Sequence, residues 1–198
     1  MQILLTNDDG IYAPGLAALE HELQKLGSVE VAAPLTEQSG VGHSITYRTP
    51  LMAREVFDGP RQRGWAVEGS PADCVKLAIS ELCSTRPQLV VSGINSGLNA
   101  GINVLYSGTV SAAIEGAFFG VTSVAVSLEW DEKARYDIAA QLAVPIISQI
   151  LAQKGPEPKL YNLNIPLAAL SRPAEVRVTP MCVAPWGESY ERRDDPRG

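Results

Sequence analysis

The chain opens with MQILLTNDDG, residues 1–10, in which an apolar run leads straight into two adjacent aspartates and a glycine. Residues 3–5, Ile-Leu-Leu, have the composition of a short buried strand, so Asp8 and Asp9 follow where that strand ends. Adjacent carboxylates repel each other, and removing them from water is costly. A divalent cation is the simplest partner that makes such a pair favourable. The stretch therefore predicts a buried strand that leads into a metal site.

Strand-like and helix-like segments alternate along the rest of the chain. We expect strands near residues 3–5, 29–33, 88–92, 121–128 and 160–163. We expect one helix to begin at Pro14 and stop at Gly27, and others over residues 71–83, 109–119 and 131–153. This alternation predicts an α/β fold with a mostly parallel sheet and helices on both faces.

Residues 45–68 break this alternation. Short strand-like pieces at 45–46, 51–52 and 65–67 are separated by turn-forming residues, Gly64 among them. Such a pattern is typical of a β-hairpin and not of a strand followed by a helix. We therefore expect a β-hairpin excursion from the main sheet.

Size and composition limit the classes of protein to which the chain can belong. Its 198 residues, 45% hydrophobic and 19% charged, are enough for one α/β domain over 1–198 with a substantial core. The net charge of −6 disfavours nucleic-acid polymers and anionic membranes as partners. Three cysteines without a CxxC pair indicate reduced thiols, and no segment resembles a secretory signal or a membrane helix. We expect a cytoplasmic protein.

The parallel topology brings three polar loops to one edge of the sheet. Right-handed crossovers place every loop that follows a strand at the carboxyl edge, where ligands bind in such folds. That edge collects Asp8 and Asp9, the loop 35–43 with Ser39, and the loop 93–108 with Asn95. Carboxylate, hydroxyl and amide oxygens suit Mg²⁺ or Mn²⁺ better than Zn²⁺.

Each of these loops also has a simpler explanation. One aspartate can cap the following helix, although this explains the second carboxylate poorly. The loop 35–43 can be an ordinary solvated surface, and the loop 93–108 a glycine-rich connection with turn-forming asparagines.

A helix start at residues 106–113, YSGTVSAA, supplies a candidate anion site. Free backbone N–H groups and the positive end of the helix dipole favour an anion there, and Ser107 and Thr109 add hydroxyl donors. The simpler explanation is a Ser/Thr cap. A hard cation that faces a helix N-terminus suits phosphoryl oxygens, with the metal polarising phosphorus and activating water. Asp8 and Asp9 are the candidate catalytic residues, and either can act as the base.

At this point the residues resemble a known family, the SurE-type survival-protein nucleotidases. The resemblance spans most of the chain in order, and its motifs together are highly specific. They are ILLTNDDGI (3–11), APG (13–15), AP (33–34) with QSG (38–40), GSPADCV (69–75), VSGINSG (91–97) and YSGTVSAA (106–113).

The resemblance implies a Rossmann-like domain and a metal-dependent phosphatase of nucleoside 5′- and 3′-monophosphates. Some members of the family also cut short polyphosphate. It implies one Mg²⁺ or Mn²⁺ ion per subunit, cytoplasmic location, and assembly as a homodimer or homotetramer. The implied metal ligands are Asp8, Asp9, Ser39 and Asn95. The residues implied near phosphate are Asn7, Gly10, Asn95, Ser107, Gly108 and Thr109.

The end of the chain departs from the family pattern. Family chains usually continue past the regions 186–187 and 193–198 into a segment used in oligomer contacts, so we expect that segment to be truncated here. Two alternatives to a SurE-type nucleotidase stay open. One is a non-catalytic nucleotide-binding module. The other is an aspartyl-phosphate phosphatase of the haloacid-dehalogenase type, although those enzymes place their two aspartates two residues apart.

Overall fold

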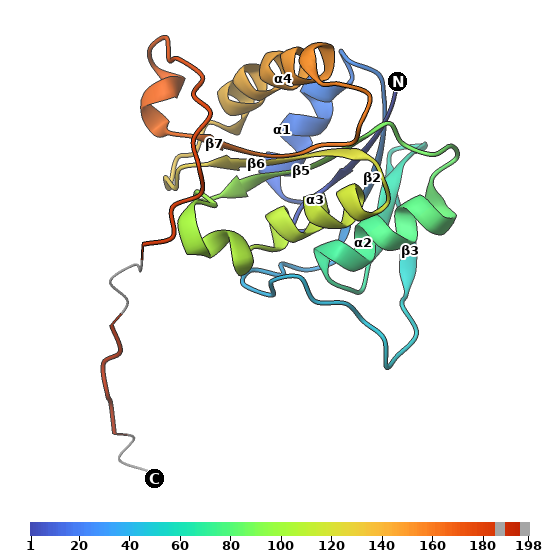
Figure 1. Cartoon of the computed structure of the whole chain (residues 1–198). Coiled ribbons are helices and arrows are strands. Elements are labelled where there is room, and N and C mark those ends of the chain that lie inside the picture. The colour runs from blue at the N-terminus through green and yellow to red at the C-terminus, as the bar shows by residue number, and fades with distance from the viewer. Residues whose placement is uncertain (185–188, 195–198) are drawn as a thin grey trace.

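A computed structural model describes residues 1–184 and 189–194, so the region 186–187 and the end of the 193–198 region lie outside the described residues. The described residues form a seven-stranded sheet of order β3-β4-β2-β1-β5-β6-β7 (Figure 1). The strands are β1 (Gln2–Thr6), β2 (Ser28–Pro34), β3 (Ala53–Asp58), β4 (Arg61–Val67), β5 (Leu89–Ser96), β6 (Thr122–Leu128) and β7 (Leu160–Ile165). The α-helices are α1 (Pro14–Leu23), α2 (Pro71–Leu77), α3 (Gly108–Phe118) and α4 (Tyr136–Gln153).

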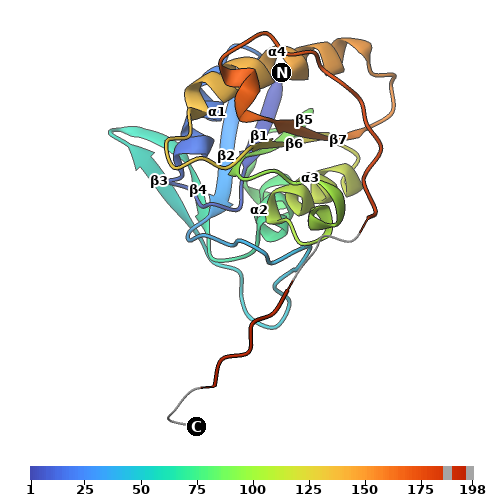
Figure 2. The same ribbon diagram turned by 90° about the vertical axis from the view of Figure 1, so that its left-hand side faces the viewer.

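Every strand pairing is parallel except β3 with β4, so the predicted mostly parallel α/β fold is confirmed. Helices α1 and α4 cover one face of the sheet, and α2 and α3 cover the other (Figures 1 and 2). Leu5 packs in the cluster on the α1–α4 face, whereas Leu4 packs with Val75 and Ala112 beneath α2 and α3. Strand β1 is therefore buried on both faces, which explains its unbroken apolar run.

The predicted β-hairpin exists, but it extends the main sheet. Strand β4 pairs in parallel with β2, with Val31 opposite Gly64, and β3 forms the antiparallel edge. The prediction that Gly64 breaks a strand was wrong. A Cβ atom at this position would lie 2.3 Å from the carbonyl oxygen of Val31, so the missing side chain lets β2 and β4 approach each other. The pieces 45–46 and 51–52 are loop.

Several predicted boundaries shift, and one of these shifts matters for the site. Strand β5 continues to Ser96 because Asn95 and Ser96 pair with Ser127 and Leu128 of β6 beyond an irregularity. Asn95 is thus fixed at the end of a strand instead of lying within a loop. Helix α1 ends at Leu23, short of the predicted stop.

Helices α4 and α2 differ in how closely their observed ends match the predicted ones. Helix α4 begins later than predicted, at Tyr136, and runs through Pro145 without ending. Helix α2 begins at Pro71, as predicted. Reciprocal hydrogen bonds between Ser70 and Asp73 cap it, and it passes into a π-helical turn over Ala78–Leu82. Across the part of the chain that the structure describes, no helix is both long enough and apolar enough to cross a membrane.

Candidate active site

Asp8 lies just beyond β1 and is 4% exposed. The hydroxyl of Thr109 donates a hydrogen bond to Asp8 Oδ1 over 2.5 Å. Gly108 packs directly on Asp8, because a Cβ atom on Gly108 would lie 2.8 Å from Asp8 Cβ and 3.1 Å from Oδ2. The first residues of α3 are therefore fitted closely around this carboxylate.

Burial raises the pKa of both aspartates. For Asp8 the rise is partly offset by the Thr109 hydroxyl and by backbone N–H groups. For Asp9 burial and the neighbouring Asp8 charge raise the pKa to about 6, against a smaller lowering by the backbone of Ser96. No lysine, arginine or histidine among residues 1–184 and 189–194 forms an ion pair with either aspartate. A carboxylate pair that is desolvated and lacks a cationic partner suits a bound metal ion.

Asn7 and Gly10, which the family resemblance places near phosphate, shape the turn that carries the aspartates. Asn7 Nδ2 donates to the Gly10 carbonyl over 3.0 Å, and the Gly10 N–H donates to Asn7 Oδ1 over 3.2 Å. Both polar atoms of the Asn7 side chain are thereby engaged, and the side chain is fully buried. Asn7 fixes the direction in which Asp8 and Asp9 leave the sheet.

The loop 35–43 meets the aspartate turn, as the parallel topology predicts. The Gln38 N–H donates to the Asp8 carbonyl oxygen over 2.8 Å, so Ser39 is one residue from a direct contact with the turn. The Ser39 hydroxyl donates to Glu37 Oε1 over 2.6 Å. The charge of Glu37 raises the pKa of both Asp8 and Asp9. Glu37 is thus an acidic neighbour of the pair for which the sequence predicts no role.

Asn95 reaches the same edge from the end of β5. Its amide nitrogen donates to the Gly97 carbonyl over 2.7 Å, so its amide oxygen is the atom that it can offer to a cation. The next residue, Ser96, contributes the backbone group that acts on Asp9. Asp9 and Asn95 therefore occupy neighbouring strand ends.

Few of the side chains that could bind a metal ion at this site carry a negative charge. Over the described ranges, no three His, Cys, Asp or Glu side chains gather closely enough to hold a metal ion on their own. A cation at Asp8 and Asp9 must therefore complete its coordination with neutral oxygen atoms. The hydroxyl of Ser39 and the amide oxygen of Asn95 are of that kind, and all four oxygen donors are hard, so the residues fit Mg²⁺ or Mn²⁺.

The N-terminus of α3 holds the Asp8 carboxylate. Ser107 caps the helix by accepting the Val110 N–H over 3.1 Å. Thr109 directs its hydroxyl and its backbone to Asp8. The family resemblance implies that Thr109 contacts phosphate, but its hydroxyl binds the Asp8 side chain. With the Thr109 and Val110 N–H groups bonded to Asp8 and Ser107, the N–H of Gly108 at the first helical position is the donor that the described helix start can offer to another group.

The sequence from residue 3 to residue 188 matches the family model described as "Survival protein SurE". The chain belongs to the SurE family. It is 59% identical over 199 residues to the protein named 5′-nucleotidase SurE from Rhodopirellula baltica, covering 100% of this chain and 79% of that protein. It is 44% identical to the protein of the same name from Heliobacterium modesticaldum, covering 100% of this chain and 73% of that protein.

A solved structure supports the same assignment. The crystal structure of SurE protein from Aquifex aeolicus superposes with a TM-score of 0.76 at 42% sequence identity. The match covers 84% of this chain and 66% of that chain. The family and the fold are thus shown by sequence and by structure independently.

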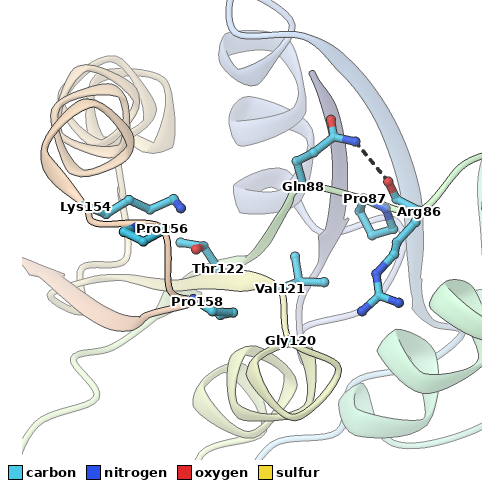
Figure 3. Close-up of a pocket in the computed structure, with 9 residues that line it drawn as sticks. All are labelled: Arg86, Pro87, Gln88, Gly120, Val121, Thr122, Lys154, Pro156 and Pro158. Atoms are coloured by element: carbon cyan, nitrogen blue, oxygen red, sulfur yellow. Dashed lines mark hydrogen bonds between the residues drawn. The ribbon is translucent and has the colours of Figure 1, made fainter.

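A cavity of about 370 Å³ in this SurE-family chain lies at the opposite, amino edge of the sheet (Figure 3). Gln88, just before β5, and Thr122, at the start of β6, are among its lining residues. Arg86 on its wall donates to the Phe119 carbonyl, at the end of α3. The positive charge of Arg86 therefore serves a helix C-terminus, and the cavity is separate from the site at Asp8.

Proposed function

We propose that this SurE-family chain is a divalent-metal-dependent phosphomonoesterase that converts nucleoside 5′-monophosphates, and also 3′-monophosphates, to nucleoside and phosphate. Relatives named 5′-nucleotidase SurE, at up to 59% identity, support nucleotidase activity. One structural observation carries the metal dependence: Asp8 and Asp9 form a desolvated acidic pair beside the start of α3, without a cationic partner among the described residues.

The proposed cofactor is one Mg²⁺ or Mn²⁺ ion per subunit. Asp8, Asp9, Ser39 and Asn95 would hold it, because they combine two charged and two neutral hard oxygen donors at one edge of the sheet. When bound, the ion supplies positive charge that polarises the phosphoryl group and makes water more acidic.

The side chains of the site divide the remaining work. Thr109 and Gly108 hold Asp8 rigidly, so we assign Asp8 to cation binding. Asp9 is less buried and has a backbone contact from Ser96, so we assign it to accept a proton from the attacking water. We assign the Gly108 N–H and the Ser107 hydroxyl to stabilise charge that develops on the phosphoryl oxygens, because Thr109 is engaged by Asp8.

Phosphate release tests this proposal. AMP, GMP and 3′-AMP are incubated with Mg²⁺, Mn²⁺ or EDTA, and Asp8→Asn is compared with the wild type. We expect the variant to lose roughly 100-fold or more of the metal-dependent activity, since about 3 kcal/mol of charge stabilisation corresponds to that factor. Asp137→Asn, on the exposed surface of α4, is the matched control. A fully active Asp8→Asn enzyme would refute the assignment.

The proposal extends to the state of the protein. We propose that residues 1–198 form one α/β domain that acts in the cytoplasm as a homodimer or homotetramer. The free thiols of Cys74, Cys83 and Cys182 support a reducing compartment. Size-exclusion chromatography with light scattering tests the assembly, and a monomer at micromolar concentration would contradict it.

A further inference from the structure

Helix α3 contacts two loops that reach the candidate site. Its first turn holds Asp8 through Thr109. Further along, Glu115 and Phe118, three residues apart on α3, hold His43 of the loop 35–52, which runs beneath α2 and α3 in blue in Figure 1. One rigid helix thus positions two candidate sources of metal ligands.

His43 is fixed both at its edge and on its face. Its Nε2 atom lies 2.7 Å from Glu115 Oε2, and its ring stacks on Phe118 with centroids 5.6 Å apart and planes at 20°. The Glu115 side chain is 7% exposed, and Lys76 of α2 places its ammonium group 3.5 Å from Glu115 Oε1. The histidine therefore packs against the surface of α3 through two contacts, a polar one to buried Glu115 and a stacking one to exposed Phe118.

Other bonds secure the loop on both sides of Ser39. Before it, the Gln38 N–H binds the Asp8 carbonyl. After it, the Gly42 N–H donates to Tyr106 over 3.0 Å, and the Thr46 N–H donates to Asp73 over 2.9 Å. Within the described structure, residues 39–41 make none of the loop's backbone hydrogen bonds. Apart from the bond of its own hydroxyl to Glu37, Ser39 is held in place by the two flanking anchors.

We propose that His43 and Glu115 are positioning residues that restrain residues 39–41, which follow the Gln38 contact with the aspartate turn. Gly42, on the C-terminal side of Ser39, is held by a single backbone hydrogen bond, whereas the next residue, His43, is held through its side chain by both Glu115 and Phe118. Its effect on a metal ion rests on the proposed function, whereas its effect on the order of the loop does not. Groups that hydrogen-bond directly to a metal ligand typically change metal affinity 10- to 100-fold when they are removed, and we expect His43, which acts on Ser39 through the loop, to lie at the lower end of that range.

Hydrogen exchange in metal-free protein tests the contact directly. His43→Ala should speed the exchange of the hydrogen-bonded amides of Gly42 and Thr46 about tenfold and leave those in β1 unchanged. His21→Ala is the matched control, because His21 is the other histidine of the chain and its side chain is 79% exposed. Should His43→Ala also expose β1, Glu115→Gln, which keeps the side-chain volume, is measured in its place. Unchanged exchange at Gly42 and Thr46 would overturn the proposal.

Mn²⁺ titration tests the consequence for the site. We expect His43→Ala to bind Mn²⁺ about tenfold more weakly, and His43→Gln, which retains a donor for Glu115, to recover most of the affinity. The KM for AMP at saturating Mn²⁺ should change less than the Mn²⁺ affinity. Wild-type affinity in His43→Ala would overturn the link to the metal. A wild type that binds no Mn²⁺ would instead refute the proposed function, and exchange would still decide the role of His43.

Discussion

Asp8 accepts a hydrogen bond from Thr109 although 101 residues separate the two in sequence. The bond lies in a buried site, where a hydrogen bond to a charged group stabilises more than one at the surface. It also opposes the rise in the Asp8 pKa that burial causes. The hydroxyl of Thr109 is therefore best understood as a support for the acidic pair.

Replacing Thr109 with valine tests that role. Thr109→Val keeps the shape of the side chain and removes the donor, so the free energy of unfolding should fall by about 1.5–3 kcal/mol. Phosphatase activity should fall at least tenfold, as is typical when a residue that hydrogen-bonds a metal ligand is lost, Asp8 being the proposed ligand. Urea unfolding and AMP hydrolysis measure the two effects. Thr122→Val, at a buried threonine on β6, is the control and should retain activity.

The raised pKa of Asp9 makes the stability of the metal-free protein depend on pH. Its pKa is about 6 in the folded protein and near 3.8 when unperturbed, so the folded state holds its proton more tightly than the unfolded chain. The stabilising effect of this protonation is fully present below pH 4 and is lost as the pH rises through about 6. Ionised Asp9 therefore weakens the fold at neutral pH.

Asp9→Asn should remove that effect. In EDTA, we expect the variant to gain stability over the wild type at pH 7.5 and to gain little at pH 4.5, as measured by urea unfolding. Asp137→Asn is a control in which the pKa shift has the opposite sign, because Arg135 lowers the pKa of Asp137 to about 2. The small stabilising effect of ionised Asp137 is lost only as the pH falls below 4. An equal gain for Asp9→Asn at both pH values would contradict the prediction.

At the level of elements, the start of α3 meets the end of β1 with no room for a side chain. A Cβ atom at Gly108 would lie 2.8 Å from Asp8 Cβ and 3.0 Å from a ring carbon of Pro71. Gly108→Ala should therefore push Asp8, the proposed cation ligand, aside and reduce activity at least tenfold, since misplacing a group of the active site by about 1 Å can cost 100-fold. AMP hydrolysis measures it. Gly155→Ala, which meets nothing within 4 Å, is the control.

Local sequence signals predicted those helices and strands whose boundaries depend only on neighbouring residues. The apolar run of β1, Pro14 at the start of α1, and the Ser70–Asp73 capping pair each determine a boundary through neighbouring residues. The extension of β5 and the place of Gly64 inside β4 depend on a strand elsewhere in the chain. The hydrophobic periodicity of one segment contains no information about which other strand it pairs with.

At the candidate site, too, features that follow from the order of the strands could be predicted, whereas contacts between particular distant side chains could not. The parallel topology predicted that the loop after β2 would meet the aspartate turn, and the bond from Gln38 to Asp8 confirms it. The bonds of Thr109 to Asp8 and of His43 to Glu115 were not predicted, because they join side chains 101 and 72 residues apart. Sequence alone thus predicted which loops gather at the edge, and the structure adds which side chains hold them.

For the whole molecule, the site joins segments that are otherwise far apart. The aspartate turn, the loop 35–43, the end of β5 and the start of α3 all meet at one edge of the sheet. A cation that binds donors from three of these segments exists in its bound form only in the folded chain. Its binding free energy therefore adds to the stability of the entire fold.

Thermal unfolding makes this measurable. At a free Mn²⁺ concentration 100-fold above its dissociation constant, the folded state should gain about 2.7 kcal/mol. For a protein of this length, that gain corresponds to a rise in Tm of about 5–10 °C. EDTA should reverse it, and Asp8→Asn should abolish it, whereas Asp137→Asn should retain it. A rise of equal size in Asp8→Asn would place the ion elsewhere on the molecule, because a site that lacks its buried carboxylate cannot bind the cation with unchanged affinity.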